Sequence, residues 1–422
     1  MNVGGTVRVP GDKSITHRLL MLAAMARGRS HVGGALTSLD ARSTARCLRA
    51  LGAAVSPLRP GSVVEIRGSG RLRAPEARLD CGNAGTAARL LLGLLAAHRF
   101  RATLTGDASL RRRPMRRVTE PLERMGARFV PDHPETLPLT IRGGTLGPLR
   151  WELPVSSAQV KGSLLFAAMA AGQPLSFREP GGRSRDHSER LLGAFGYGIE
   201  ERDGWVHFSP TGRIESFDIQ VPGDPSSAAF LVGAALLAES GELTITGVGL
   251  NPTRTGFLAV IQRMGARVRR EHVADACGEP VGDLHVGPAS LRGTEVAAHE
   301  VPSLIDEIPL LAVLASRAAG TTAFRRVGEL RVKESDRLSL IAANLRALGA
   351  RAEVAGEDLH VEGGEAPPRG RVRTEGDHRL AMAFAVLGTL PGARVTVDDP
   401  GSADVSFPGF AAALRSVRRR AR

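Results

Sequence analysis

The feature that most constrains the fold of this 422-residue chain is a short pattern that occurs five times. In each copy, an apolar helix end is followed by a glycine and then by a strand-like stretch. The glycines are Gly52, Gly126, Gly196, Gly265 and Gly349, spaced 69 to 84 residues apart. Glycine just past a helix adopts the left-handed cap conformation without strain. The pattern therefore predicts five helices that end at these glycines.

An alternating apolar stretch follows each glycine, as is typical of a half-buried strand. The stretches are Val63–Arg67, Leu139–Arg142, Trp205–Phe208, Leu284–Val286 and Leu359–Val361. The repeating unit is about 70 residues long, which suits a supersecondary unit with two helices better than a solenoid repeat. Single helix–glycine–strand turns are common in α/β proteins, but five at similar spacing favour a true repeat and an α/β fold.

Two turns with the same spelling, Val-Pro-Gly-Asp, divide the chain at residues 9–12 and 221–224. Such turn residues break both helix and strand. We expect a first domain over residues 11–222 and a second over residues 1–10 and 223–422, with a two-strand hinge at the turns. Residues 1–10 read as a strand rather than as a signal peptide.

Composition excludes several classes of protein. The net charge is +13, but the arginines are dispersed, acids lie between them, and the chain has only two Trp and one Tyr, which disfavours a nucleic-acid-binding protein. The longest apolar run, Ala228–Ala238, is too short to span a membrane. Cys47, Cys81 and Cys277 lack metal-ligand or disulfide spacing, which fits a reducing cytoplasm and no metal site.

Several helix starts combine a cation with small polar residues. Gly11–Arg18, Asp80–Arg89 and Ser156–Lys161 each place Ser, Asn, Thr or Gly beside Lys or Arg, ahead of apolar helices expected at Leu90–Ala97 and Gly162–Ala171. Helix N-termini bind anions through free N–H groups. No P-loop, nucleophile elbow or Ser–His–Asp order is present. The chain should bind phosphates and carboxylates and perform proton transfer.

The second half contains three segments of charged residues in apolar surroundings. If residues 332–346 form a helix, Lys333 and Arg337 share a face, with Glu334 one step round. That face is either a solvated helix surface or one wall of an anion site. In Val301–Pro309, one of two adjacent acids must be buried or face a cleft. A third segment, Asp377–Met382, starts an apolar helix.

At these residues the chain closely resembles the family of 5-enolpyruvylshikimate-3-phosphate synthases. The matching motifs are Gly11-Asp-Lys-Ser, Asn83-Ala-Gly-Thr, Ser157-Ala-Gln, Leu330-Arg-Val-Lys-Glu-Ser-Asp-Arg and Asp377-His-Arg, and the match runs from about residue 9 to Pro408. The resemblance implies two similar domains, each of three βαβαββ units in an inside-out α/β barrel. It also implies transfer of the enolpyruvyl group of phosphoenolpyruvate to the 5-hydroxyl of shikimate 3-phosphate, with no metal or organic cofactor.

The resemblance assigns residues to each substrate. Shikimate 3-phosphate would contact Lys13, Ser14, Arg18, Ser157, Ala158, Gln159, Arg185, Asp306 and Lys333. Phosphoenolpyruvate would contact Lys13, Gly85, Arg113, Gln159, Arg337 and Arg379. Asp306 would accept the hydroxyl proton, and either Glu334 or Lys13 would protonate the methylene carbon. His187 is expected to have a structural role.

Further motifs resemble the second class of this family: Arg185-Asp-His-Ser-Glu189, Ser157-Ala-Gln-Val-Lys161 and Asn251-Pro-Thr-Arg254. The chain also has Val405 where first-class members carry a phosphate-binding Lys. The related enolpyruvyl transferase acting on a UDP-sugar is the alternative, but it requires a Gly-Ala-Lys-Asn start and a loop Cys. Because the expected site residues come from both domains, we expect the domains to close on the substrates. We also expect the protein to be a cytoplasmic monomer.

Overall fold

The computed structural model describes residues 1–419, which form two compact units. The first unit comprises residues 11–221 with 275–279; the second comprises residues 1–10, 222–274 and those from 280 onward. Residues 275–279, expected in the second domain, group with the first unit because Cys277 packs against its core and Arg190 donates to the carbonyl of Gly278. None of the helices within residues 1–419 is long and apolar enough to cross a membrane.

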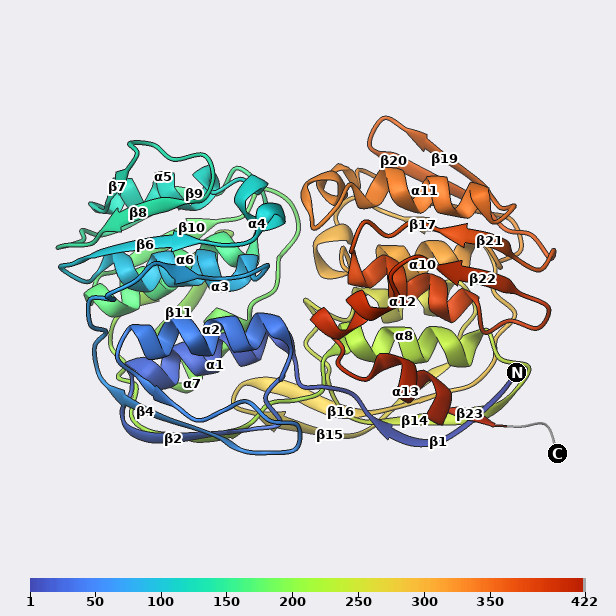
Figure 1. Ribbon diagram of the computed structural model, residues 1–422, viewed down its shortest axis with the longest axis horizontal. Coiled ribbons are helices and arrows are strands. Elements are labelled where there is room, and N and C mark those ends of the chain that lie inside the picture. The colour runs from blue at the N-terminus through green and yellow to red at the C-terminus, as the bar shows by residue number, and fades with distance from the viewer. Residues whose placement is uncertain (420–422) are drawn as a thin grey trace. The chain divides into compact units, whose positions relative to one another are not determined.

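The first unit contains three repeats (Figure 1). The first repeat consists of α1 (Lys13–Met25), β2 (Arg27–Gly33), α2 (Leu39–Ala50), β3 (Ala54–Val55) and β4 (Val64–Ser69), completed by β13 (Asp218–Gln220). The second consists of β5 (Leu79–Asp80), α3 (Gly85–Ala96), β6 (Arg101–Thr105), α4 (Ala108–Arg112), α5 (Arg116–Met125), β7 (Arg128–Val130) and β8 (Leu139–Arg142). The third consists of β9 (Leu149–Glu152), α6 (Ala158–Ala171), β10 (Leu175–Arg178), α7 (His187–Ala194), β11 (Gly198–Arg202) and β12 (Trp205–Ser209).

The second unit follows the same plan. Its first repeat consists of β1 (Asn2–Arg8), α8 (Pro225–Leu236), β14 (Ser240–Gly249), α9 (Gly256–Arg263), β15 (Val268–Ala276) and β16 (Glu279–Val286). The next consists of β17 (Glu295–Val296), η1 (Val301–Ser303), α10 (Ile308–Ala315), β18 (Thr321–Phe324), η2 (Gly328–Val332), α11 (Arg337–Ala347), β19 (Arg351–Ala355) and β20 (Asp358–Glu362). The last consists of β21 (Arg369–Val372), α12 (His378–Leu387), β22 (Arg394–Val397), η3 (Pro400–Val405), α13 (Phe410–Ser416) and β23 (Arg418–Arg419).

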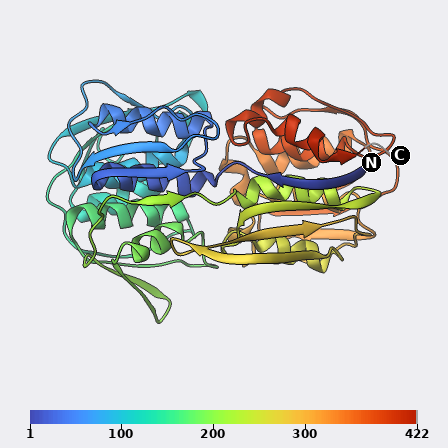
Figure 2. The same cartoon turned by 90° about the horizontal axis from the view of Figure 1, so that it is seen from below.

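Five of the six sheets share one strand order. The first strand of a repeat pairs in parallel with the second, and the fourth strand lies between the second and the third, as in β5-β6-β8-β7 and β17-β18-β20-β19. The last repeat is shorter: β21 and β22 form a two-stranded sheet, and β23 pairs with β1. Figure 2 shows β1, in dark blue, beside its parallel partner β14. The chain therefore inserts residues 11–221 of the first unit between β1 and α8.

All five glycines of the repeat pattern end a helix in the same way. Their φ angles lie between 83° and 118°. At each site the glycine N–H donates to the carbonyl three residues earlier, and the next N–H donates to the carbonyl five residues before it, as in Ala53 to Leu48 and Ala350 to Leu345. These paired bonds are those of a Schellman cap. The internal repeat predicted from the sequence is confirmed.

Each unit has its own hydrophobic core, built around helices that are buried on nearly every side. Every residue of α8 and α10 is buried, as are 11 residues of α1. Such helices must be enclosed, and in each unit the sheets lie outside them (Figure 1). The predicted inside-out arrangement of helices and sheets is confirmed. Within residues 1–419, each strand pairs only with strands of its own sheet, so the six sheets do not join into a closed barrel.

The two Val-Pro-Gly-Asp turns have equivalent local structures. A Cβ on Gly11 would lie 2.0 Å from the carbonyl oxygen of Gly34, and one on Gly223 would lie 2.8 Å from a methyl of Val9, so both glycines allow close packing. The aspartates cap helices: Asp12 accepts from the Ile15 N–H and Asp224 from the Ser226 N–H, both at 2.8 Å. Each turn thus starts the first helix of a unit.

Candidate active site

The first helix of the first unit begins at one of the helix starts that were predicted to bind anions. Lys13 is the first residue of α1, and its Nζ lies 3.4 Å from Oδ2 of Asp40 in α2. Ser14 is buried beside it. The ammonium is therefore held at the N-terminus of a helix, where the helix dipole also favours an anion.

Arg18 connects three segments that carry predicted site residues. Its buried guanidinium donates to Oγ of Ser188 at 2.7 Å, to the carbonyl of Ser14 at 3.1 Å and to the carbonyl of Ala158 at 3.2 Å. Burial lowers the pKa of Arg18 to about 10, against the opposing effect of Glu189. Arg18 remains a cation near neutral pH, and it ties the starts of α1, α6 and α7 together.

His17, the neighbour of Arg18, is fully buried and hydrogen-bonded to Oγ1 of Thr44 at 2.7 Å. Burial, followed by the charges of Lys13 and Arg18, lowers the pKa of His17 from 6.5 to about 3. The folded protein therefore keeps this imidazole neutral beside two cations of the candidate site.

Acidification should reveal this buried imidazole. Below pH 6.5 the unfolded chain binds a proton at His17, but the folded protein does not until about pH 3, so stability is lost as the pH falls through that range. Lowering the pH from 7 to 5 should reduce the unfolding free energy of the wild type by about 2 kcal/mol more than that of His17→Gln. Urea unfolding at both pH values measures this difference, and equal losses in the two proteins would contradict it.

A second cluster surrounds the start of α3. Arg113 is buried and donates to Oδ1 of Asn83 at 2.6 Å. Arg89 donates to Oε1 of Gln159 and to the carbonyl of Pro114 at 2.9 Å. A Cβ on Gly85 would lie 3.1 Å from Nη1 of Arg89 and 3.2 Å from Nη1 of Arg113. The glycine therefore leaves space beside two guanidinium groups, as a small anion requires.

The start of α6 provides a third group. Ser157 is the N-cap, and its hydroxyl oxygen accepts from the Val160 N–H at 3.5 Å. Gln159 donates to Oγ1 of Thr86 at 3.0 Å. The helices α3 and α6 begin earlier than predicted, at Gly85 and Ala158, because these small and polar residues extend the first turn rather than preceding it.

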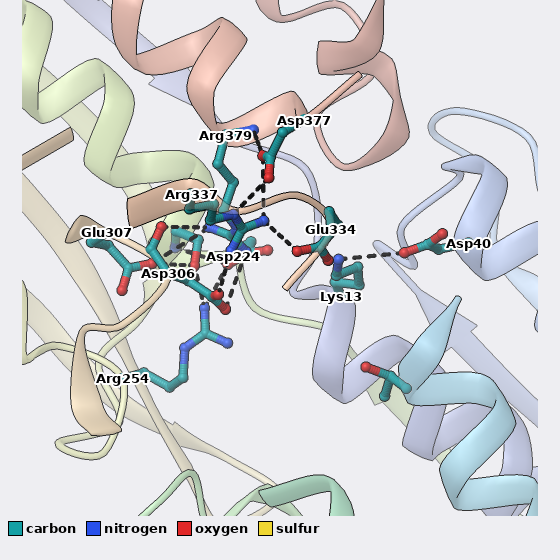
Figure 3. Close-up of polar contacts among 12 residues, drawn as sticks. Lys13, Asp40, Asp224, Arg254, Asp306, Glu307, Glu334, Arg337, Asp377 and Arg379 are labelled. Atoms are coloured by element: carbon teal, nitrogen blue, oxygen red, sulfur yellow. Dashed lines mark hydrogen bonds and ion pairs between the residues drawn. The ribbon is translucent and has the colours of Figure 1, made fainter. Parts of the chain in front are cut away.

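In the second unit, Asp306 lies between two arginines (Figure 3). Its Oδ1 accepts from Nη1 of Arg337 at 3.3 Å, and its Oδ2 lies 3.3 Å from Nη2 of Arg379. Arg337 starts α11 and Arg379 lies in the first turn of α12. Both guanidinium groups are buried, so Asp306 is paired with two buried cations.

Glu334 also contacts Arg337, through its Oε2 (Figure 3). The prediction of a helix over residues 332–346 was wrong at its start: η2 ends at Val332 and α11 begins at Arg337. Asp336 is the reason, because its side chain accepts from the Ser339 N–H at 3.1 Å and makes a better N-cap than a helix interior residue. Lys333 and Glu334 therefore lie on a loop, and Glu334 reaches Arg337 from there.

Asp377 holds this group of residues together. It is fully buried, caps α12, and accepts from Nε of Arg337 at 2.7 Å and from Oγ of Ser335 at 3.0 Å. Although burial opposes it, Arg337 lowers the pKa of Asp377. The ion pair likewise raises the pKa of Arg337 against the effect of its burial. Asp377 and Arg337 are therefore a fully charged buried pair.

Lys333 differs from these cations. Burial lowers its pKa, although Asp306 and Glu329 oppose the shift. Within residues 1–419 no carboxylate lies within ion-pair distance of its Nζ. A cation without a fixed partner is suited to bind an anionic ligand.

Glu307 directly follows Asp306, and one of these two adjacent acids was predicted to be buried or to face a cleft. Glu307 is buried. Its Oε1 accepts from Oγ of Ser226 and lies 3.7 Å from Nη1 of Arg379. Arg254 donates to the same Ser226 at 2.7 Å and to Asp224 at 3.0 Å. This network of hydrogen bonds and ion pairs connects the start of α8 with the start of α12, beside Asp306.

Nearly the whole chain matches one protein family. The family model for EPSP synthase (3-phosphoshikimate 1-carboxyvinyltransferase) matches residues 1–414. The chain belongs to the EPSP synthase family. The UDP-sugar alternative is not favoured, and the predicted enzyme class, a carboxyvinyltransferase, is confirmed.

Individual relatives support the family match. A 3-phosphoshikimate 1-carboxyvinyltransferase of Acidiphilium cryptum (strain JF-5) is 46% identical, with 98% of this chain and 94% of that protein aligned. One of Thermus thermophilus is 49% identical, with 96% and 94% aligned. The solved structure of EPSP synthase from Acinetobacter baumannii has a TM-score of 0.87 at 37% identity, covering 99% of this chain and 96% of that one. The enolpyruvyl transferase NikO from Streptomyces tendae, at 19% identity and a TM-score of 0.78 over 99% and 95% of the chains, shares the fold.

Sequence reasoning missed several contacts that organise this EPSP synthase family site. Asp40 contacts Lys13, Arg89 contacts Gln159, and Lys161 forms buried ion pairs with Glu179 and Glu189. Asp40 sits on a helix face that looks ordinary in the sequence, and nothing in the sequence indicates Gln159 as the partner of Arg89. Lys161 gave a usable signal: a Lys in an otherwise apolar helix needs a buried anionic partner. His187, expected to be structural, is buried and hydrogen-bonded to Glu279 at 2.7 Å.

Proposed function

We propose that this chain transfers the 1-carboxyvinyl group of phosphoenolpyruvate to the 5-hydroxyl of shikimate 3-phosphate and releases phosphate. The observation that carries the proposal is the full-length similarity to relatives named for this reaction. The site chemistry agrees with it, because buried arginines and helix N-termini suit two substrates that together carry two phosphates and two carboxylates.

The proposed roles follow the groups described above. Shikimate 3-phosphate is bound by Lys13, Ser14, Arg18, Ser157, Ala158, Gln159, Arg185, Asp306 and Lys333. Phosphoenolpyruvate is bound by Lys13, Gly85, Arg113, Gln159, Arg337 and Arg379. These residues lie on both units, so both must reach the same pair of substrates.

The reaction proceeds by addition and elimination. The 5-hydroxyl oxygen forms a bond to C2 of phosphoenolpyruvate and gives its proton to Asp306, while a proton adds to the C3 methylene. Removal of a proton from C3 and cleavage of the C2–O bond to phosphate then restore the double bond. A positioned carboxylate is suited to each proton transfer.

Glu334 is the proposed carrier of the C3 proton, with Lys13 as the alternative. In the free protein, the contact between Glu334 and Arg337 stabilises the ionised form of Glu334. We propose that the carboxylate of phosphoenolpyruvate takes over Arg337 when it binds. Glu334 then loses its cationic partner, and its affinity for a proton increases at the stage when a proton donor is needed.

The test of this function is phosphate release. Release should require both phosphoenolpyruvate and shikimate 3-phosphate, and the second product should carry the carboxyvinyl ether at the 5-position. Phosphate release with UDP-N-acetylglucosamine in place of shikimate 3-phosphate, or no release with either acceptor, would overturn the proposal.

Substrate binding should also bring the two units together, because the reacting carbon must be shielded from water. Small-angle scattering should record a smaller radius of gyration with shikimate 3-phosphate and glyphosate, a phosphonate competitor of phosphoenolpyruvate, than without ligands. An unchanged radius under saturating ligand would contradict closure.

We further propose that the protein works as a cytoplasmic monomer. Cys47, Cys81 and Cys277 form no disulfide, as a reducing compartment permits. Sedimentation at working concentrations checks the monomer.

A further inference from the structure

The loop between β10 and α7 carries Arg185, one of the proposed ligands of shikimate 3-phosphate, and is anchored by a buried polar network. Glu179, just after β10, accepts from Nζ of Lys161 at 2.9 Å and from the Ser184 N–H at 3.2 Å. Its other oxygen accepts from the Ser184 hydroxyl. Lys161 also donates to the Ser184 carbonyl at 3.0 Å. Every polar group of Ser184, the residue before Arg185, is therefore held.

The network also fixes the loop to two helices. Lys161 lies in α6, one turn after the N-cap Ser157, and its Nζ is 2.8 Å from Oε1 of Glu189 in α7. Although burial opposes it, Glu189 and Glu179 raise the pKa of Lys161, so it is charged. The loop is therefore tied to the helix start at which Ser157 and Gln159 are proposed to bind the same substrate.

Stability alone is a poor reason for this arrangement. The side chains of Lys161, Glu179 and Glu189 are 1%, 9% and 3% exposed. Burying one ammonium with two carboxylates costs desolvation energy, and apolar side chains of the same size often give equal or greater stability. What a charged network adds is direction, because each bond requires a specific geometry.

We propose that Glu179 and Lys161 are positioning residues that hold Ser184 and thereby aim Arg185 at shikimate 3-phosphate. They act through Arg185 and do not touch the substrate. This inference rests on the proposed function, since it assumes that Arg185 binds this substrate.

The experiment is a double-mutant cycle between Glu179→Gln and Arg185→Ala. Gln keeps the shape of Glu but weakens the bonds to Lys161 and Ser184. In the wild-type background, Glu179→Gln should raise the KM for shikimate 3-phosphate about tenfold, the effect of losing one charge-assisted hydrogen bond. The KM for phosphoenolpyruvate and kcat should stay close to wild type. In the Arg185→Ala background, the same change should have little further effect.

Two more variants keep the test decisive. Ser184→Ala removes one bond to Glu179, leaves the buried charges in place, and should raise the same KM by a smaller factor, so it replaces Glu179→Gln if that variant does not fold. Glu152→Gln is the matched control: Glu152 pairs with Arg178, the residue before Glu179, but is 53% exposed, and its loss should leave both KM values unchanged.

The outcomes are separable. Additive effects in the cycle, or an unchanged KM for shikimate 3-phosphate in Glu179→Gln and Ser184→Ala, would overturn the positioning role. Direct titration of shikimate 3-phosphate separates this result from failure of the proposed function. If the wild-type protein does not bind this substrate, the function fails; if it binds and the variants bind equally well, only the inference fails.

Discussion

Replacing Glu334 by Gln should lower the rate of phosphate release by about 100- to 10,000-fold, the usual contribution of a general acid or base. The amide cannot carry a proton to C3 of phosphoenolpyruvate and back. Gln still fills the same volume beside Arg337, so titration should show that both substrates bind. The measurement is steady-state phosphate release with both substrates present.

A second readout separates the two candidates for the acid. In deuterated water the wild type should exchange protons at C3, and Glu334→Gln should lose this exchange. If Glu334→Gln retains the exchange and Lys13→Met loses it, Lys13 is the acid and the assignment of Glu334 is wrong. The control is Glu362→Gln, because Glu362 also pairs with an arginine, Arg351 at 3.0 Å, but lies on the surface. That variant should have normal activity.

Replacing Asp377 by Asn should lower the unfolding free energy by about 3 kcal/mol, because it leaves the buried Arg337 without its fully buried carboxylate partner. The KM for phosphoenolpyruvate should rise as well, since Asp377 orients Arg337 and caps the helix that carries Arg379. Urea unfolding and steady-state kinetics measure the two effects.

Asp336→Asn is the matched control for Asp377→Asn. Asp336 also caps a helix and pairs with an arginine, but its side chain is 42% exposed, as is much of Arg331. Its replacement should lower the unfolding free energy by less than about 1 kcal/mol and leave the kinetics unchanged. Equal losses in the two variants would show that burial of the Asp377–Arg337 pair has no special effect.

Much of the fold follows from local rules. A glycine after an apolar helix end predicts a Schellman cap wherever it occurs, because the φ angle it needs is strained for other residues. Period-two alternation located strands such as β8 and β12 to within one residue. The start of α11 was wrong because helix periodicity outweighed a capping signal: Asp336 followed three residues later by Ser339 marks the boundary.

Some residues of the candidate site could also be predicted from local sequence, but their contacts could not. Anion-binding residues at helix starts, such as Lys13 and Ser157, could be predicted because a helix start and a nearby cation are adjacent in sequence. The partners of these residues could not: Lys161 and Glu179 are 18 residues apart, and Arg337 and Asp377 are 40 apart. No period or motif in one sequence indicates which carboxylate faces which cation.

The sequence by itself determined the repeat, the helix ends and the residue types that make this a carboxyvinyltransferase of the EPSP synthase family. These features depend on local backbone preferences and on the alternation of apolar and polar residues. Only the tertiary structure decided which charges are buried together. Asp377 forms an ion pair with Arg337, and Lys161 forms ion pairs with Glu179 and Glu189. The reason is physical: the energy of an ion pair depends on distance and burial, and folding sets both.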